Sequence, residues 1–173
     1  PHGKVTLRGV KVGADGVLGD PTAGTAVVTW MTERAIAAYC AVQVGVCDKA
    51  IRMTAAYTTE RKQFDRPIAT FQAVQQRAAD AFIELDIIRM ATWEALYRLS
   101  LGQPSPEQVR IAKYWASDGG QRIVVAAQHL HGGIGVDVDY ALHRYFWWAK
   151  HIELLLGSAP VQLARIGAEI AAD

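Results

Sequence analysis

The sequence predicts a mostly α-helical protein, an antiparallel bundle of about five helices with a short β remnant at its N-terminal end. Three observations predict this class. Apolar residues recur at helical spacing over long segments, proline does not interrupt the longest of them, and strand-like alternation is confined to the start of the chain. With 173 residues, of which 51% are hydrophobic, the chain is long enough to bury a core.

The N-terminal segment has the pattern of a strand. Residues 4–12 alternate in period 2, with a shift of register at Gly9. One or two strands do not fold alone. We therefore expect residues 1–24 to be the end of a middle β domain and residues 25–173 to form a helical bundle domain. Because the chain begins without Met and within this pattern, we expect it to be a piece of something longer.

The helices of the predicted bundle are separated by clear stop and start signals. The first ends before Asp65-Arg66-Pro67, because proline disfavours a helical residue before it. Gly102 ends the second, and Ser-Pro-Glu at 105–107 begins the third with a cap, a first-turn proline and an acidic residue. The predicted ranges are 25–60, 70–101, 106–130, 140–152 and 158–171.

Charge and composition exclude several classes of protein. With 18 Lys and Arg against 17 Asp and Glu, interspersed along the chain, the sequence has no electrostatic footprint for nucleic acid. Its first residues lack the apolar core expected of a secretory signal, and we find no run of about 18 uncharged apolar residues that could cross a membrane. Cys40 and Cys47 share one helical face but lie too far apart for a disulfide. We expect two buried thiols in a cytoplasmic protein.

The histidines and cysteines do not predict a metal centre or a nucleophile. His129 and His131 are two residues apart, so on a helix they point to different sides. We expect the histidines to be capping or core residues and predict no metal. The sequence also lacks Gly-x-Ser-x-Gly and a P-loop.

Two segments could bind a ligand. Residues 60–72 place two guanidinium groups, an aromatic ring and an amide around a proline-fixed turn, which suits a phosphate-bearing aromatic ligand. The alternative is a solvated helix end, where the dipole favours arginine. Gly132-Gly133-x-Gly135 could let a ligand approach the backbone, or it could simply end a helix with glycine at positive φ.

Together, Glu60-Arg61-x-x-Phe64, Gln72 and the glycine loop resemble the C-terminal half of the acyl-CoA dehydrogenases, over essentially the whole chain. The resemblance implies a flavin-dependent α,β-dehydrogenation of an acyl-CoA thioester. It also implies FAD at a dimer interface, a tetramer built as a dimer of dimers, and electron-transfer flavoprotein as the acceptor. Thr-Glu-Arg-Ala at 32–35 is similar to actinobacterial members that act on steroid side chains and other bulky acyl-CoAs, often as α2β2 heterotetramers.

The resemblance also assigns the cofactor contacts, which lie against the FAD of the neighbouring subunit. The matching residues are Arg61, Phe64, Gln72, Gln128, Gly132 and Gly133. His129 stands at the glutamine position of the family's Gln-x-x-Gly-Gly loop, and Gln128 precedes it. Asp65 replaces the glycine that usually follows the phenylalanine.

The catalytic base is the open question. Family members remove the α-proton of the acyl-CoA with a carboxylate while hydride passes to the flavin. The usual glutamate position is Leu156, which accepts no proton. Glu33, two residues before the position used by a minority of members, and Glu153, one turn before Leu156, are the alternatives. The chain is expected to be part of a dehydrogenase or its non-catalytic partner subunit. The rival from another class is a structural oligomerisation module that has lost the cofactor.

Overall fold

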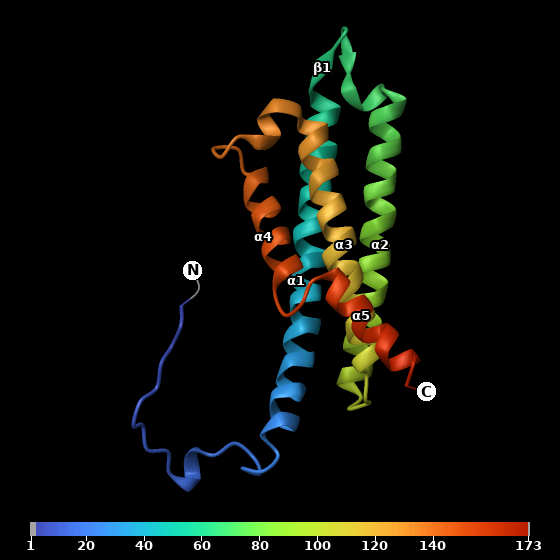
Figure 1. Cartoon of the computed structure of the whole chain (residues 1–173). Helices are drawn as coiled ribbons and strands as arrows, with labels where there is room; N and C mark the ends of the chain where they lie inside the picture. Colours follow the sequence, from blue (N-terminus) through green and yellow to red (C-terminus); the bar gives the residue numbers. More distant parts are fainter. Residues whose placement is uncertain (1–2, 173) are drawn as a thin grey trace.

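The computed structural model describes residues 3–172 and contains five α-helices within that range. The helices are α1 (Gly24–Glu60), α2 (Gln72–Ser100), α3 (Pro106–His131), α4 (Leu142–Leu154) and α5 (Ala159–Ile170). Two short strands, β1 (Lys62–Gln63) and β2 (Arg66–Pro67), and the 3-10 turns η1 (Ala14–Gly16), η2 (Ile68–Thr70) and η3 (Gly132–Val136) complete the chain. Consecutive helices α1 to α4 run antiparallel (Figure 1), which confirms the predicted fold class. No helix in the described range is long and apolar enough to cross a bilayer.

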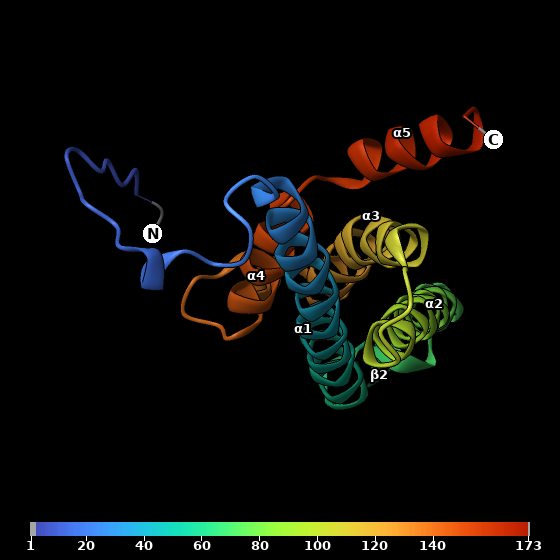
Figure 2. The ribbon, with the colours of Figure 1, turned by 90° about the horizontal axis from the view of Figure 1, so that it is seen from below.

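Helix α3 is the centre of the bundle, because it packs against all four other helices. Seen along the bundle, α2 and α4 lie on opposite sides of α1 (Figure 2). Glycines let α3 approach its neighbours closely: Gly119 faces Ile88 of α2, and Gly120 faces Gln43 of α1. A Cβ on Gly120 would lie 2.0 Å from Gln43 Nε2, so a larger residue there would push α1 and α3 apart.

The core has two parts, one on each side of α1 and α3. The first, between α1, α2 and α3, includes Cys40, Cys47, Leu85, Ile88 and Ile123. The second, between α1, α3 and α4, includes Val46, Val124, Leu142, Ala149 and Ile152. Both cysteines are free and fully buried, and burial raises the pKa of each thiol to about 12. The prediction of two buried thiols is confirmed.

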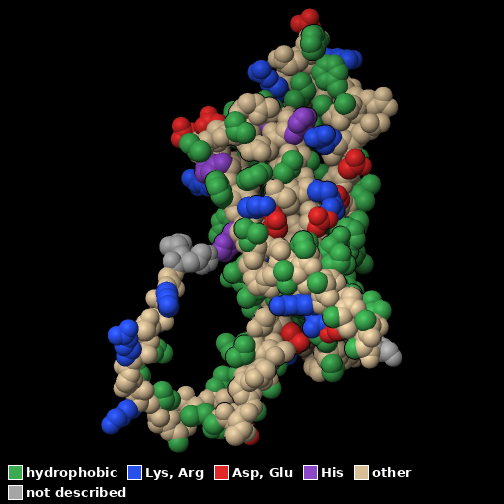
Figure 3. Space-filling view, viewed as in Figure 1, with side chains coloured by type: hydrophobic (Ala, Val, Ile, Leu, Met, Phe, Trp, Pro, Cys, Tyr) green, Lys and Arg blue, Asp and Glu red, His purple; other side chains and the backbone are tan. Residues whose placement is uncertain are grey.

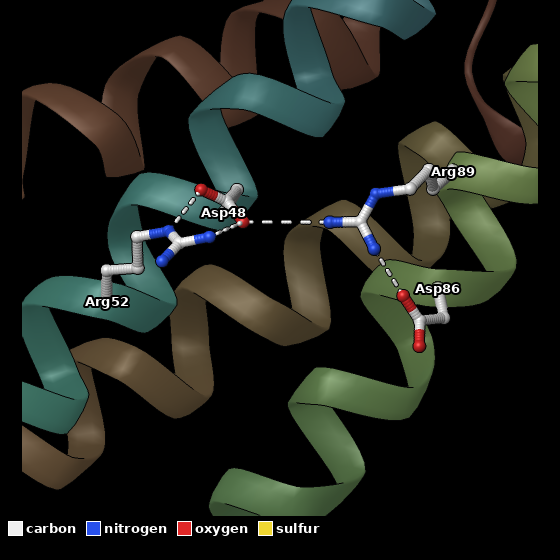
Figure 4. Close-up of polar contacts among 4 residues, drawn as sticks. All are labelled: Asp48, Arg52, Asp86 and Arg89. Carbon is white, nitrogen blue, oxygen red and sulfur yellow. Dashed lines mark hydrogen bonds and ion pairs between the residues drawn. The ribbon is translucent and has the colours of Figure 1, made fainter.

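An ion-pair network on the bundle surface links α1 to α2 (Figure 4). Asp48 of α1 accepts a hydrogen bond from Arg52 Nε at 2.7 Å and lies 3.6 Å from Arg89 of α2. Arg89 also pairs with Asp86 of its own helix. These side chains are partly or largely exposed, so the pairs contribute little to the stability of the fold.

The strand predicted over residues 4–12 is wrong for this structure. Residues 3–23 contain no strand; they are exposed, with η1, bends at Gly9 and Gly19 and a turn at residues 21–22, and they run away from the bundle (Figure 1). The alternating side chains Val5 and Leu7 remain 82% and 75% exposed. The physical reason is that a strand needs a neighbour for its hydrogen bonds, and no described segment supplies one. The assignment of residues 1–24 to a middle β domain remains a prediction.

The turn predicted between the first two helices is a small antiparallel hairpin. Lys62 pairs with Pro67 and Gln63 with Arg66. Its two-residue loop, Phe64-Asp65, has φ angles of 52° and 64°. Two consecutive positive φ angles are typical of a type I′ turn. Aspartate tolerates this conformation, whereas a phenylalanine there costs about 1–2 kcal/mol.

Candidate functional site

The antiparallel bundle brings the six predicted cofactor contacts to one end. The end of α1, the β1–β2 hairpin, the start of α2 and the end of α3 all lie at the top of Figure 1. We call residues 60–72 and 128–135 together the hairpin end. Lys and Arg side chains lie close to this end in Figure 3, below an acidic side chain at the tip.

Arg61 joins α1 to the hairpin and has a fixed backbone with an unpaired side chain. Its N–H donates to Tyr57 O at 2.8 Å, and its carbonyl accepts from the N–H of Ile68 at 2.8 Å. Its guanidinium is exposed and forms no ion pair within the described residues. An exposed guanidinium without an ion-pair partner can bind a phosphate through two parallel hydrogen bonds.

Phe64 lies at the tip of the hairpin and is 87% exposed. Its ring meets Phe71 edge to face, with centroids 6.2 Å apart. The guanidinium of Arg66 stacks over the same Phe71 ring, with Cζ 4.2 Å from the centroid. Phe71 is therefore a platform for both residues, a role that the sequence did not indicate. Arg66 is engaged in this stack, so Arg61 and Arg66 do not act as an equivalent pair.

The three glycines of the loop after α3 have different roles. Gly132 has a φ of 64° and donates its N–H to His129 O, so it ends the helix. A Cβ on Gly132 or Gly133 would meet no atom within 4 Å, which leaves both backbones open to an approaching group. Gly135 is buried, and a Cβ there would lie 2.4 Å from Gln128 O, so its role is structural.

A surface groove borders the hairpin end. The first turns of α2 form one side and the end of α3 the other. Arg77 and Asp80 line the groove from α2, and His129 lines it from α3. The structure therefore places His129, at the family's glutamine position, on this groove, whereas Gln128 lies half-buried beside it. Gln72, the first residue of α2, is exposed next to the hairpin.

The position expected for the catalytic base lies far from the hairpin end, between α4 and α5. Leu156 is 37% exposed there and has a φ of 59°, followed by Gly157 with a φ of 103°. The buried side chain of Gln162 holds this turn, because its Nε2 donates to the carbonyls of Leu156 at 3.3 Å and Gly157 at 3.0 Å.

Lys113 supports the same turn from α3, a role that sequence reasoning missed. Its side chain is fully buried, at 1% exposure, and its Nζ donates to the carbonyls of Ile152 and Glu153. It also donates to Ser117 Oγ at 2.8 Å. Burial lowers the pKa of Lys113 to about 8. The cation thus satisfies carbonyls at the C-terminus of α4 that have no partner within the helix.

The two glutamates considered as bases lie in different surroundings. Glu153 Oε2 accepts a hydrogen bond from Lys150 at 2.8 Å, so its carboxylate is already paired. Glu33 is half-buried and lines a groove between α1, α3 and α5. Gln162 lines this groove too, and its buried Oε1 has no partner among the described residues. Gln162 therefore lines the Glu33 groove and also holds the Leu156 turn.

No group of three or more potential metal ligands occurs within the described residues. A long bundle with an unpaired arginine, a strained aromatic tip and an open Gly-Gly backbone at one end is consistent with the C-terminal domain of a flavin-dependent dehydrogenase. Residues 22–171 match the acyl-CoA dehydrogenase C-terminal domain, and the chain belongs to that family. Members of this family use FAD.

The relatives found are consistent with the resemblance to actinobacterial steroid enzymes. Acyl-CoA dehydrogenase FadE27 of Mycobacterium tuberculosis is 40% identical over 177 residues, covering 98% of this chain and 46% of FadE27. A Tcur3481–Tcur3483 steroid ACAD variant is 47% identical with a TM-score of 0.79, covering 83% of this chain and 41% of that chain. A chain of the ChsE4–ChsE5 complex of M. tuberculosis is 42% identical with a TM-score of 0.83. The match covers 86% of this chain and 41% of that chain. The chain therefore spans less than half the length of these relatives.

Proposed function

We propose that this chain is the C-terminal part of an acyl-CoA dehydrogenase subunit and that its hairpin end covers the FAD of a neighbouring subunit. Phe64 carries the proposal. A large apolar ring held at positive φ in open solvent gains nothing within its own chain beyond one edge contact, so its conformation is explained by a group that covers it in the assembly. The unpaired Arg61 lies at the base of the same hairpin.

The residues present fit such a cofactor. Arg61 supplies a free guanidinium for a diphosphate, Phe64 and Phe71 supply aromatic surface, and Gly133 lets the backbone approach without a Cβ. Gln72 and Gln128 would add amide hydrogen bonds. When bound, FAD accepts the hydride that leaves the β-carbon of the acyl-CoA. The contribution of this chain at the hairpin end is to bind and orient the cofactor.

The substrate is proposed to be a bulky acyl-CoA thioester, such as one with a steroid side chain, because the relatives include a steroid ACAD. Glu33 is the proposed base for the α-proton, since its groove meets the Leu156 turn through Gln162. The second candidate is a non-catalytic partner subunit, and Leu156 at the usual base position favours it. Electron-transfer flavoprotein is the proposed acceptor.

A long apolar stripe on α2 supports assembly with a second subunit. It consists of six exposed side chains: Phe82, Ile83, Met90, Trp93, Tyr97 and Leu101. Spacing of seven residues places Ile83, Met90 and Tyr97 on one face. Six half-exposed side chains present on the order of 600 Å², close to the roughly 800 Å² that each partner buries in a standard interface. We propose a dimer of dimers, with identical or different subunits.

The Glu33→Gln substitution separates the two functional candidates. In the full-length protein assembled with its partner subunit, we expect acyl-CoA-dependent dye reduction to fall by about a hundredfold or more, because a carboxylate base is lost. Leu156→Glu on this background should restore part of the rate by supplying a carboxylate at the usual position. Glu153→Gln is the matched control and should leave the rate unchanged. Full activity of Glu33→Gln, with FAD still bound, would reject Glu33 and favour the non-catalytic partner.

A further inference from the structure

His131, the last residue of α3, lies in a buried aromatic stack directly before the Gly132-Gly133 backbone. Its ring stacks on Tyr57 of α1, with centroids 4.5 Å apart and planes 21° from parallel. On another side it meets the Tyr140 ring at 5.4 Å. The imidazole thus lies between α1 and the segment that precedes α4.

The imidazole makes one hydrogen bond among the described residues, and its burial favours the neutral form. His131 Nδ1 lies 2.7 Å from the carbonyl of Ala127, which only accepts, so Nδ1 carries the proton. Nε2 is buried without a partner among the described residues, and burial lowers the pKa of His131. The ring therefore acts mainly through its aromatic faces, not through charge.

The stack connects the two halves of the hairpin end. The carbonyl of Tyr57 accepts a hydrogen bond from the N–H of Arg61. Tyr57, whose ring packs on His131, therefore also fixes the start of the hairpin. On the other side, a Cβ on Gly135 would lie 3.1 Å from His131 Cβ, so the loop after α3 folds tightly over this residue. Tyr140 also lies near the end of α1. Burial is the main cause that raises the pKa of its hydroxyl, and the nearby Tyr57 and Glu60 raise this pKa further.

We infer that His131 and Tyr57 are positioning residues that hold the Arg61–Phe64 hairpin and the Gly132-Gly133 loop in register, so that both contact one cofactor. The two segments are more than sixty residues apart in the sequence and come from different helices. The stack adds a direct link between these segments to the packing of α1 on α3, and it matters because residues 61–66 of the hairpin are exposed. This inference rests on the proposed function, since the cofactor is the one proposed there.

The test compares His131→Leu, which keeps apolar volume but removes the ring, with His131→Phe, which keeps the ring. In the full-length assembled protein, we expect His131→Leu to weaken FAD binding by about fivefold to tenfold, the magnitude of a lost aromatic pair. His131→Phe should bind FAD as the unmodified protein does. Val109→Ala, a buried truncation at the other end of α3, controls for lost stability and should not change FAD affinity.

Hydrogen exchange in the FAD-free protein tests the coupling independently of cofactor binding. His131→Leu should speed exchange of the Arg61 and Ile68 amides, although both lie in another part of the sequence, and His131→Phe and Val109→Ala should not. Unchanged exchange at these amides in His131→Leu would overturn the inference. If the unmodified protein binds no FAD but the exchange effect is present, the proposed function fails while the coupling stands.

Discussion

Replacing Arg61 with alanine is expected to weaken FAD binding to the assembled full-length protein by about tenfold to a hundredfold. Hydrogen bonds to a charged group contribute about 1.5–3 kcal/mol, and Arg61 has an exposed guanidinium with no ion-pair partner within residues 3–172. The fold should not change, because the contacts of Arg61 that hold the hairpin come from its backbone. Titration of the FAD-free protein, followed by flavin fluorescence, measures the affinity.

Two control variants make this result specific to the hairpin end. Arg52→Ala removes an exposed arginine that pairs with Asp48 on the bundle surface and should leave FAD affinity unchanged (Figure 4). Arg61→Lys keeps the charge but loses the planar fork, so an intermediate affinity is expected. An Arg61→Ala protein that assembles and binds FAD as tightly as the unmodified protein would rule out a cofactor contact at Arg61.

Replacing Lys113 with methionine should have the largest effect on stability. Methionine fills a similar volume but leaves the buried carbonyl of Ile152 without its donor and the carbonyl of Glu153 with only Ser117 Oγ, at 3.3 Å. A buried unsatisfied group costs about 1–3 kcal/mol, so we expect a loss of about that size in the free energy of unfolding. Urea denaturation measures it. Lys150→Met, which removes only a partly exposed pair with Glu153, is the matched control and should cost less than about 1 kcal/mol.

The pH dependence of the free energy of unfolding provides a second test of the role of Lys113. The folded-state pKa of Lys113 is about 8, below its ordinary value of 10.5. Between these values the unfolded chain binds more protons than the folded chain at this site, so its contribution to stability rises with pH. The difference in unfolding free energy between the unmodified protein and Lys113→Met should therefore widen from pH 8 to 10.5. A constant difference across this range would contradict a buried, titrating Lys113.

The helices were predictable because their limits are set by local chemistry. Gly102 lies at positive φ just after α2, and Pro106 is the first residue of α3, as the sequence indicates. The hairpin was not predictable, because Phe64-Asp65 lacks the Asn-Gly or Asp-Gly pair that normally signals a type I′ turn.

The candidate site was predictable only in part, because contacts between residues distant in the sequence leave no local pattern. The matched motif residues gather at one end because antiparallel helices bring the ends of α1 and α3 and the start of α2 together. The supporting residues were missed. Lys113 lies on an apolar helical face, which could have indicated burial, but the carbonyls that it binds are 39 and 40 residues away. The Tyr57–His131 stack also joins residues distant in the sequence.

The most direct test of the account is sedimentation of the full-length protein with its partner subunit, followed at both protein and flavin wavelengths. If the hairpin end covers the FAD of a neighbouring subunit, the flavin absorbance should sediment with the assembled oligomer and be absent from the dissociated subunit. Correctly assembled oligomers that carry no flavin after incubation with FAD would contradict the account. They would leave the structural oligomerisation module as the better description.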